Sequence, residues 1–200
     1  MNATIVVASA NAGKLREVSQ ILADLDLRVV PQSDFSVPPV RETGTSFVEN
    51  ALLKARHAAR CSGHPAIADD SGIEVDALGG APGIFSARYA GQGAGDEQNL
   101  RKLLADLKDV PDTRRTARFR CAMVYVNHDR DARPIVRQAC WEGRILRESR
   151  GTNGFGYDPV FYVPTHDCSS AELAPEVKNT LSHRGQALRQ LVEALKDIKR

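Results

Sequence analysis

Lysines and carboxylates stand beside predicted helix starts and strand ends, in a pattern that suits a bound polyphosphate. Lys14 closes the segment SANAGK (9–14), which directly follows the apolar run TIVVA. The segment is not a P-loop, because that motif needs a glycine where Ala8 stands and a Ser or Thr where Leu15 stands. A lysine in the first turn of a helix opposes the helix dipole, so its position is unfavourable unless an anion lies nearby. The alternative, a solvated lysine whose stem packs on the loop, stays open.

Two adjacent carboxylates, Asp69 and Asp70, end a predicted short strand in the segment PAIADDSG. Successive side chains of a strand point to opposite faces, so we expect these two to have different tasks. Glu42 precedes a predicted helix and Lys54 lies on it. Mg²⁺ takes oxygen ligands and usually one or two protein carboxylates, so this set suits hydrated magnesium on a polyphosphate. The alternative is a polar turn and an exposed helix lysine.

Two further clusters suit recognition of a base. His183 and Arg184 place cations in the first turn of the last predicted helix, where the fixed donor fork of an arginine can read a carbonyl or phosphate oxygen. Phe155 and Tyr157 lie in the glycine-rich loop NGFGYDP, and an aromatic ring there can stack on a base. Two alternatives to base recognition stay open. The two cations can stand at the helix start by chance, and Phe155 can be a core residue.

Apolar periodicity predicts the elements that position these residues. Strands are expected over 1–8, 27–30, 65–72, 116–126 and 135–146, and helices carry apolar stripes over 15–25, 48–59, 100–107 and 188–198. Ser46 and Glu49 match a capping box, which accounts for Glu49 without a metal role. Helices and strands alternate first and antiparallel strands dominate the middle, so the class is α/β with a mixed sheet.

Composition bounds the class of protein. The 200 residues are 42% hydrophobic and 26% charged, which predicts one globular domain over residues 1–200. A formal net charge of +2 argues against a nucleic-acid polymer as partner. The four cysteines lack paired spacing and indicate reduced thiols in the cytoplasm, and no apolar run approaches a membrane span.

Six segments stand in one order along the chain: SANAGK, ETGTSFVENALLKA, AIADDSG, LGGAPGIFSARYAG, GFGYDPVF and SHRGQAL. This series resembles the inosine triphosphate pyrophosphatase family, most closely its bacterial type, over about residues 5–195. Two departures stand out. Ser9 and Ala10 replace the frequent Thr-Gly of the family, and Arg41 replaces a frequent second acid.

The resemblance implies an elongated mixed sheet with two lobes and a central cleft, a homodimer and dependence on Mg²⁺. The reaction it implies is hydrolysis of deaminated purine nucleoside triphosphates (dITP, ITP, XTP and dXTP) to the monophosphate and pyrophosphate, which cleanses the nucleotide pool.

Motif matching also implies the roles of individual residues. Glu42 and Asp70 would hold the metal, and Asp70 and Lys54 would be catalytic. Substrate contacts would come from Ser9, Ala10, Asn11, Ala12, Gly13, Lys14, Ser71, Phe155, Gly156, Tyr157, Asp158, Lys178, His183 and Arg184.

The expected mechanism is attack of water on the α-phosphorus with Asp70 accepting its proton. His183 and Arg184 would select the 6-oxo group of hypoxanthine or xanthine over the amino group of adenine. Two rival classes stay open: a non-catalytic nucleotide- or RNA-binding module, and a hydrolase of modified pyrimidine triphosphates or another phosphoanhydride.

Overall fold

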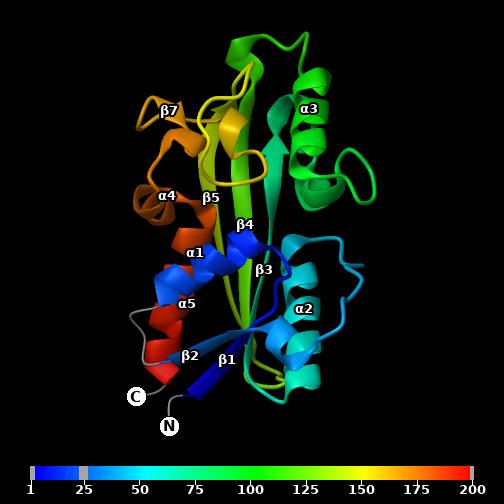
Figure 1. Ribbon diagram of the computed structural model, residues 1–200, viewed down its shortest axis with the longest axis vertical. Coiled ribbons are helices and arrows are strands. Elements are labelled where there is room, and N and C mark those ends of the chain that lie inside the picture. The colour runs from blue at the N-terminus through cyan, green and yellow to red at the C-terminus, as the bar shows by residue number, and fades with distance from the viewer. Residues whose placement is uncertain (1–2, 23–26, 199–200) are drawn as a thin grey trace. The chain divides into compact units, whose positions relative to one another are not determined.

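The computed structural model describes residues 3–22 and 27–198. Their strands form one seven-stranded sheet in the order β2-β1-β3-β4-β5-β6-β7 (Figure 1). The strand bounds are β1 Ala3–Val7, β2 Leu27–Pro31, β3 Ala66–Val75, β4 Thr116–Val126, β5 Ile135–Ile145, β6 Phe161–Val163 and β7 Cys168–Ser169. β1 pairs parallel with β2 and β3, whereas β6 pairs antiparallel with β5 and β7. The predicted α/β class with a mixed sheet is therefore confirmed.

Five α-helices and six short 3₁₀ helices accompany the sheet in the described residues. The α-helices are α1 Ala12–Leu22, α2 Phe47–Ser62, α3 Asp96–Asp106, α4 Pro175–Leu181 and α5 His183–Ile198. The 3₁₀ helices are η1 Gln32–Phe35, η2 Asp76–Leu78, η3 Gly83–Arg88, η4 Asp112–Arg114, η5 Asp158–Val160 and η6 Ser170–Glu172. Leu25, the last residue of the first predicted apolar stripe, lies outside the described residues.

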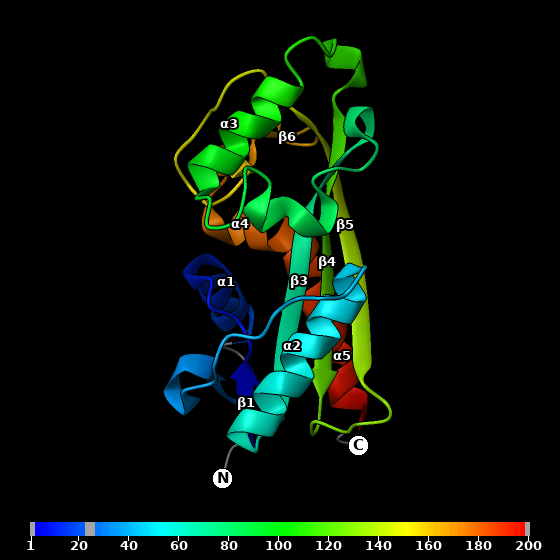
Figure 2. The same cartoon turned by 90° about the vertical axis from the view of Figure 1, so that its right-hand side faces the viewer.

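The chain divides into two compact units, of which the first comprises residues 1–70, 121–139 and 184–200. Its core joins α1 and α5 to one face of the sheet through Val18, Leu22, Ile67, Leu188 and Leu191. α2 lies along the other face (Figure 2). This helix buries small side chains, at 51, 55, 58 and 59, all alanine, and a helix with an alanine face can approach a sheet closely.

The second unit comprises residues 71–120 and 140–183. Its core is rich in aromatic residues: Phe119 and Trp141 both pack against Phe161, with ring centroids 4.5 and 5.1 Å away. Leu100, Leu103 and Leu107 of the α3 segment join this core, as their predicted stripe requires. Burial of these large side chains is the main stabilising term for the unit.

β3 differs from the prediction in one respect that matters for the site. The strand does not end at Asp69 and Asp70 but continues to Val75. Ser71 and Gly72 look like turn residues in sequence, yet Ile73 and Val75 beyond them are completely buried and hold the strand in the core of the second unit. The two carboxylates therefore lie in the middle of a strand, on a rigid support. β3, β4 and β5 contribute residues to both units, and the single domain stays a prediction.

Candidate functional site

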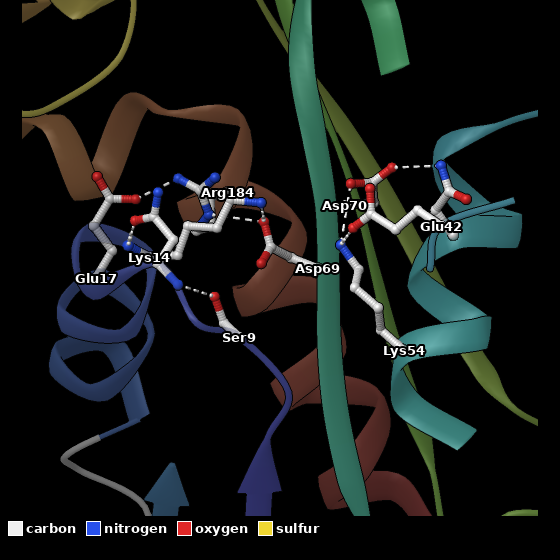
Figure 3. Close-up of polar contacts among 10 residues, drawn as sticks. Ser9, Lys14, Glu17, Glu42, Lys54, Asp69, Asp70 and Arg184 are labelled. Carbon is white, nitrogen blue, oxygen red and sulfur yellow. Dashed lines mark hydrogen bonds and ion pairs between the residues drawn. The ribbon is translucent and has the colours of Figure 1, made fainter. Parts of the chain in front are cut away.

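Asp69 and Asp70 point to opposite faces of β3, as predicted from the alternation of strand side chains (Figure 3). Asp69 Oδ2 lies 2.9 Å from Lys14 Nζ of α1. Asp70 Oδ1 lies 3.1 Å from Lys54 Nζ of α2. Each lysine singled out from the sequence is thus paired with one of the two aspartates, and the paired residues all belong to the first unit.

On the α2 side, two carboxylates converge on one ammonium group. Lys54 Nζ lies 2.7 Å from Glu42 Oε1 as well as 3.1 Å from Asp70 Oδ1. This arrangement shows that a cation is stabilised between Glu42 and Asp70. It brings together three residues that the sequence analysis placed in the metal and catalytic groups.

Asn50 completes this cluster, although its sequence position predicts no role for it. Its side chain is fully buried on α2, and its Nδ2 donates a hydrogen bond of 3.2 Å to Asp70 Oδ2. Asn50 Oδ1 accepts the backbone N–H of Gly44 at 2.8 Å. The amide therefore links the segment before α2 to the carboxylate on β3. The available signal in the sequence was an uncharged polar residue one turn before Lys54, on the same helix face as that lysine and outside the predicted apolar stripe.

The two aspartates have opposite electrostatic environments. Burial raises the pKa of the Asp70 carboxyl above its ordinary value, because the opposing effect of Lys54 and Lys14 is smaller. Burial also acts to raise the pKa of Asp69, but Lys14 and Arg184 together outweigh it and hold that pKa far below its usual range. Two neighbouring carboxyls whose pKa values are pushed apart are typical of sites that divide acid–base and structural tasks.

The segment from Ser9 to Lys14 is organised by its own side chains. Ser9 Oγ accepts the Asn11 N–H at 3.2 Å, and Asn11 Oδ1 accepts the Lys14 N–H at 3.0 Å, which caps the start of α1. Ala10 is not among the described residues with positive φ, so alanine is compatible with the place where the family often has glycine. Ala12 and Gly13 form the first turn of α1, whose N–H groups suit an anion.

Glu49 has the structural role expected of it. Ser46 Oγ accepts the Glu49 N–H at 3.2 Å, and the Glu49 carboxylate accepts hydrogen bonds from the Thr45 backbone at 2.6 Å and the Thr45 hydroxyl at 2.9 Å. The partner of the carboxylate is Thr45, one residue earlier than a simple capping box requires. Glu49 thus fixes the start of α2, the helix that presents Asn50 and Lys54.

In the second unit, Asp158 organises the glycine loop that the sequence linked to base binding. Its Oδ2 lies 2.6 Å from Lys178 Nζ and accepts the Phe155 N–H at 2.8 Å, while its Oδ1 accepts the Ser170 hydroxyl at 2.9 Å. Lys178 Nζ also lies 5.0 Å from the centroid of the Phe155 ring. A Cβ at Gly154, where φ is +78°, would come within 2.1 Å of Asp158 Oδ2, so this position requires glycine.

The remaining residues that are predicted to contact the substrate differ in their protein contacts. The His183 ring stacks on Phe119, with centroids 4.7 Å apart and an interplanar angle of 8°. Tyr157 belongs to the core of the second unit, and its hydroxyl donates to the Ser86 carbonyl at 2.8 Å. The Gly156 N–H donates to Asp96. Ser71 follows Asp70 on β3 and is half-buried. Contact of these residues with a substrate stays a prediction.

Arg184 is buried, and its guanidinium meets two carboxylates of the first unit. Its Nε donates to Asp69 Oδ2 at 3.2 Å and its Nη1 to Glu17. Glu17 has no predicted role, because one acidic residue on the polar face of a helix carries no signal of a buried partner. The expected contact of Arg184 with a purine stays a prediction.

The donor set at Glu42 and Asp70 fits magnesium. Within 3–22 and 27–198 no cluster of three or more acidic, histidine or cysteine side chains could hold a metal ion. Two carboxylates are nevertheless the usual protein share of a Mg²⁺ site, whose other ligands are water and substrate phosphate. The ammonium already held between these carboxylates is a cation in the same place.

The same fold is present in solved structures of other proteins. A HAM1 protein from Coxiella burnetii superimposes with a TM-score of 0.90 at 50% identity, over 98% of this chain and 99% of that one. The Staphylococcus aureus Ham1 protein gives a TM-score of 0.84 at 41% identity, over 98% of this chain and all of its own. A sequence model of the Ham1 family matches residues 5–194. The chain therefore belongs to the Ham1 family.

Curated relatives with known names are also similar over almost their whole length. The dITP/XTP pyrophosphatase of Photobacterium profundum is 58% identical over 193 residues, which is 96% of this chain and 98% of that protein. The dITP/XTP pyrophosphatase of Shigella flexneri is 56% identical with the same coverage. These names agree with the family that the six sequence segments resemble. Among the described residues, no helix is both long and apolar enough to cross a membrane.

Proposed function

We propose that this protein hydrolyses deaminated purine nucleoside triphosphates, namely dITP, ITP, XTP and dXTP, to the monophosphate and pyrophosphate. The observation that carries the proposal is the cluster in which Asp70, on a rigid strand, contacts Asn50 and Lys54 while Lys54 contacts Glu42. The names of the close relatives support the same activity. Its role is to remove these nucleotides from the pool before they enter DNA or RNA.

Glu42 and Asp70 are the residues that would hold Mg²⁺. When bound there, the ion would neutralise phosphate charge and polarise the phosphorus–oxygen bonds. Lys14, Lys54 and the first-turn N–H groups of α1 bind phosphate oxygens and stabilise the charge that develops on the pyrophosphate. Most of the rate then comes from positioning and electrostatics.

Asp70 acts as the general base that takes the proton of the attacking water. A general base works best when its pKa is not far below the working pH, and burial raises the pKa of this carboxyl. Asn50 fixes the orientation of the carboxylate by donating to one of its oxygens. The other oxygen of Asp70 forms an ion pair with Lys54. The phosphates of the substrate also attract this lysine.

The base is recognised by Phe155, Lys178, His183 and Arg184. Phe155 stacks on the purine, Lys178 lies near it, and His183 and Arg184 face its 6-oxo group, which accepts hydrogen bonds. Adenine presents an amino group in that position and leaves these donors unpaired, so adenine nucleotides are rejected. Gly156, Tyr157 and Asp158 shape the loop that carries Phe155, and Ser71 contacts the substrate next to Asp70.

The proposal includes the assembly and location implied by the resemblance. The protein forms a homodimer and works in the cytoplasm. All four cysteine thiols are free, which is usual for proteins of a reducing compartment.

A substrate panel with Mg²⁺ tests the function. We expect dITP and XTP to release pyrophosphate far faster than dATP or a modified pyrimidine triphosphate, with little orthophosphate. Asp70→Asn should lower kcat by a factor of about 10² to 10⁴, the usual contribution of a general base, with an unchanged circular dichroism spectrum. Asp109→Asn, at an exposed position, is the matched control and should keep full activity.

Each alternative class has its own outcome in this panel. Tight nucleotide or RNA binding without release of pyrophosphate would replace the proposal with a binding module. Equal turnover of dITP and dATP, or a preference for pyrimidines, would refute the purine selection. Near-normal activity of Asp70→Asn would remove Asp70 as the base.

A further inference from the structure

Phe155 stands between two peptide groups that are each hydrogen-bonded to a carboxylate. The Phe155 N–H donates to Asp158 Oδ2 at 2.8 Å, and the Gly156 N–H donates to Asp96 Oδ2 at 2.8 Å. The first bond holds the peptide plane before Phe155 and the second holds the plane after it. Because φ and ψ are the only soft backbone angles between these planes, the two bonds together fix the backbone of Phe155 and the direction in which its ring leaves the loop.

The second of these carboxylates comes from outside the loop. Asp96 is the first residue of α3 and stands 60 positions before Gly156 in the chain. The apolar side of α3 belongs to the core of the second unit. The buried Asn99 also ties this helix to the preceding segment, because its Oδ1 accepts the Ala90 N–H at 2.8 Å and its Nδ2 donates to the Ala87 carbonyl at 3.2 Å. Asp96 is therefore presented by a well-anchored helix.

The loop has few constraints of its own, so an external bond matters for its conformation. Gly151, Gly154 and Gly156 all take positive φ, and glycine loses more backbone freedom on folding than any other residue. Tyr157 makes the other printed contact with the glycine-rich segment 78–95, through the bond of its hydroxyl to the Ser86 carbonyl at 2.8 Å. The segment 78–95 and the start of α3 thus support the loop from one side.

We propose that Asp96 is a positioning residue for base recognition, which holds the peptide group after Phe155 so that the ring is set in advance for stacking on a purine. The inference deepens the proposed function and rests on it, because it takes Phe155 to stack on the base of the substrate. Asp96 acts through the loop and not on the nucleotide.

Preorganisation is the physical effect at work. A loop that is ordered before the ligand arrives has already lost its conformational freedom, so binding costs less free energy. The effect concerns the base and not the phosphates. Removal of the Asp96 carboxylate should therefore weaken ligands that carry a purine and leave a ligand made only of phosphates unchanged.

An acidic residue in the first turn of a helix is also stabilising by itself, through the helix dipole. Glu97 supplies the matched control for this effect, since it is the other acidic residue of the first turn of α3. Its carboxylate forms an ion pair with Arg101 on the same helix. Both Asp96 and Glu97 are exposed, so alanine at either position should leave the protein folded.

Steady-state kinetics with Asp96→Ala, Asp96→Asn and Glu97→Ala test the proposal. We expect Asp96→Ala to raise the KM for dITP about three- to tenfold, the effect of losing one exposed hydrogen bond to a charged group, with kcat within about twofold of the wild type. Asp96→Asn keeps an oxygen that accepts the Gly156 N–H and should restore most of the loss. Glu97→Ala should behave as the wild type. The competitive inhibition constant of inorganic tripolyphosphate should be the same in all four proteins.

Amide hydrogen exchange of the Gly156 N–H, followed by NMR in the free protein, gives a readout that does not depend on turnover. It should be faster in Asp96→Ala than in the wild type and unchanged in Glu97→Ala.

Three results would overturn the inference: an unchanged KM for dITP in Asp96→Ala, an equal rise in Glu97→Ala, or an equal weakening of tripolyphosphate in Asp96→Ala. Absence of dITP hydrolysis by the wild type would refute the proposed function. The exchange experiment would then still decide whether Asp96 holds the loop, because unchanged exchange in Asp96→Ala would show that it does not.

Discussion

Asp69 and Asp70 are neighbours in the chain, yet each contacts a different lysine on a different face of β3. The pairing explains why Lys14 can stand at a helix start, where a cation is unfavourable by itself. The anion that the position requires is present in the protein as Asp69. At this scale the site consists of two ion-paired lysines, one on each side of a strand.

Lys54 gives a prediction that concerns metal binding alone. Lys54→Met should raise the affinity for Mn²⁺ in the absence of nucleotide by about tenfold or more. The reason is that it removes a positive charge that lies 2.7 Å from Glu42 Oε1 and 3.1 Å from Asp70 Oδ1, the two metal-ligand candidates. Electron paramagnetic resonance of free Mn²⁺ measures this directly. The same substitution should lower turnover, since the proposed function also assigns Lys54 to phosphate binding.

Lys14→Met is the control for that measurement. It removes the other lysine, which contacts Asp69 on the opposite face of β3 and acts on Asp70 only at a distance, so it should change nucleotide-free Mn²⁺ binding much less than Lys54→Met does. If Lys54→Met bound Mn²⁺ no better than the wild type, Glu42 and Asp70 would not be the metal ligands.

At the scale of elements, the start of α2 determines the geometry around Asp70. Ser46 and Glu49 cap the helix, and Asn50 connects the Gly44 backbone to the Asp70 carboxylate. The capping residues Ser46 and Glu49 form a local pattern that can be recognised in the sequence. The contact between Asn50 and Asp70 joins residues 20 positions apart and depends on how α2 packs on the sheet.

Gly44 is the position where this element is most sensitive. A Cβ there would lie 2.6 Å from Glu49 Cβ and 2.7 Å from Asn50 Oδ1. Gly44→Ala should therefore lower the free energy of unfolding by about 1–3 kcal/mol, the usual cost of overpacking, and should reduce kcat by displacing Asn50 from Asp70. Urea denaturation and steady-state kinetics measure the two effects.

Gly95→Ala is the steric control, because Gly95 also precedes a helix but a Cβ there meets nothing within 4 Å. It should cost less than about 1 kcal/mol, as expected for glycine and alanine at a helix N-cap, and should keep full activity. Equal losses of activity in the two variants would argue against the role of Asn50.

At the scale of the whole molecule, two hydrophobic cores share three strands. β3 supplies Ile67 to the core of the first unit and Ile73 to that of the second, and β4 supplies Cys121 and Phe119 in the same way. Loss of either core removes the support of strands on which the other depends. The two units should therefore unfold together.

Two probes, one in each core, test this cooperativity. Trp141, the single tryptophan, reports on the second unit by fluorescence. Cys121 reports on the first unit by thiol labelling, because burial raises the pKa of its thiol to about 12 and makes it unreactive while folded. In a background with Cys61, Cys140 and Cys168 changed to Ser, both probes should give the same urea midpoint. Separate midpoints would mean that the units unfold independently.

The sequence by itself determined the local features of this protein. Periodicity located α1, α2, α3, α5 and most strands, because apolar spacing reflects which face of an element is buried. Alternation on β3 separated Asp69 from Asp70, and the capping pattern explained Glu49. The chain order of the six segments was enough to indicate the family, which the comparisons confirm.

Only the tertiary structure decided which residues meet. The continuation of β3 to Val75 depends on burial in the second core, which outweighs the turn propensity of Ser71 and Gly72. Arg184 and Glu17 are 167 positions apart, and Asn50 and Asp70 are 20 apart. Such partners have no spacing that a sequence could display, because their contact is a result of packing between elements.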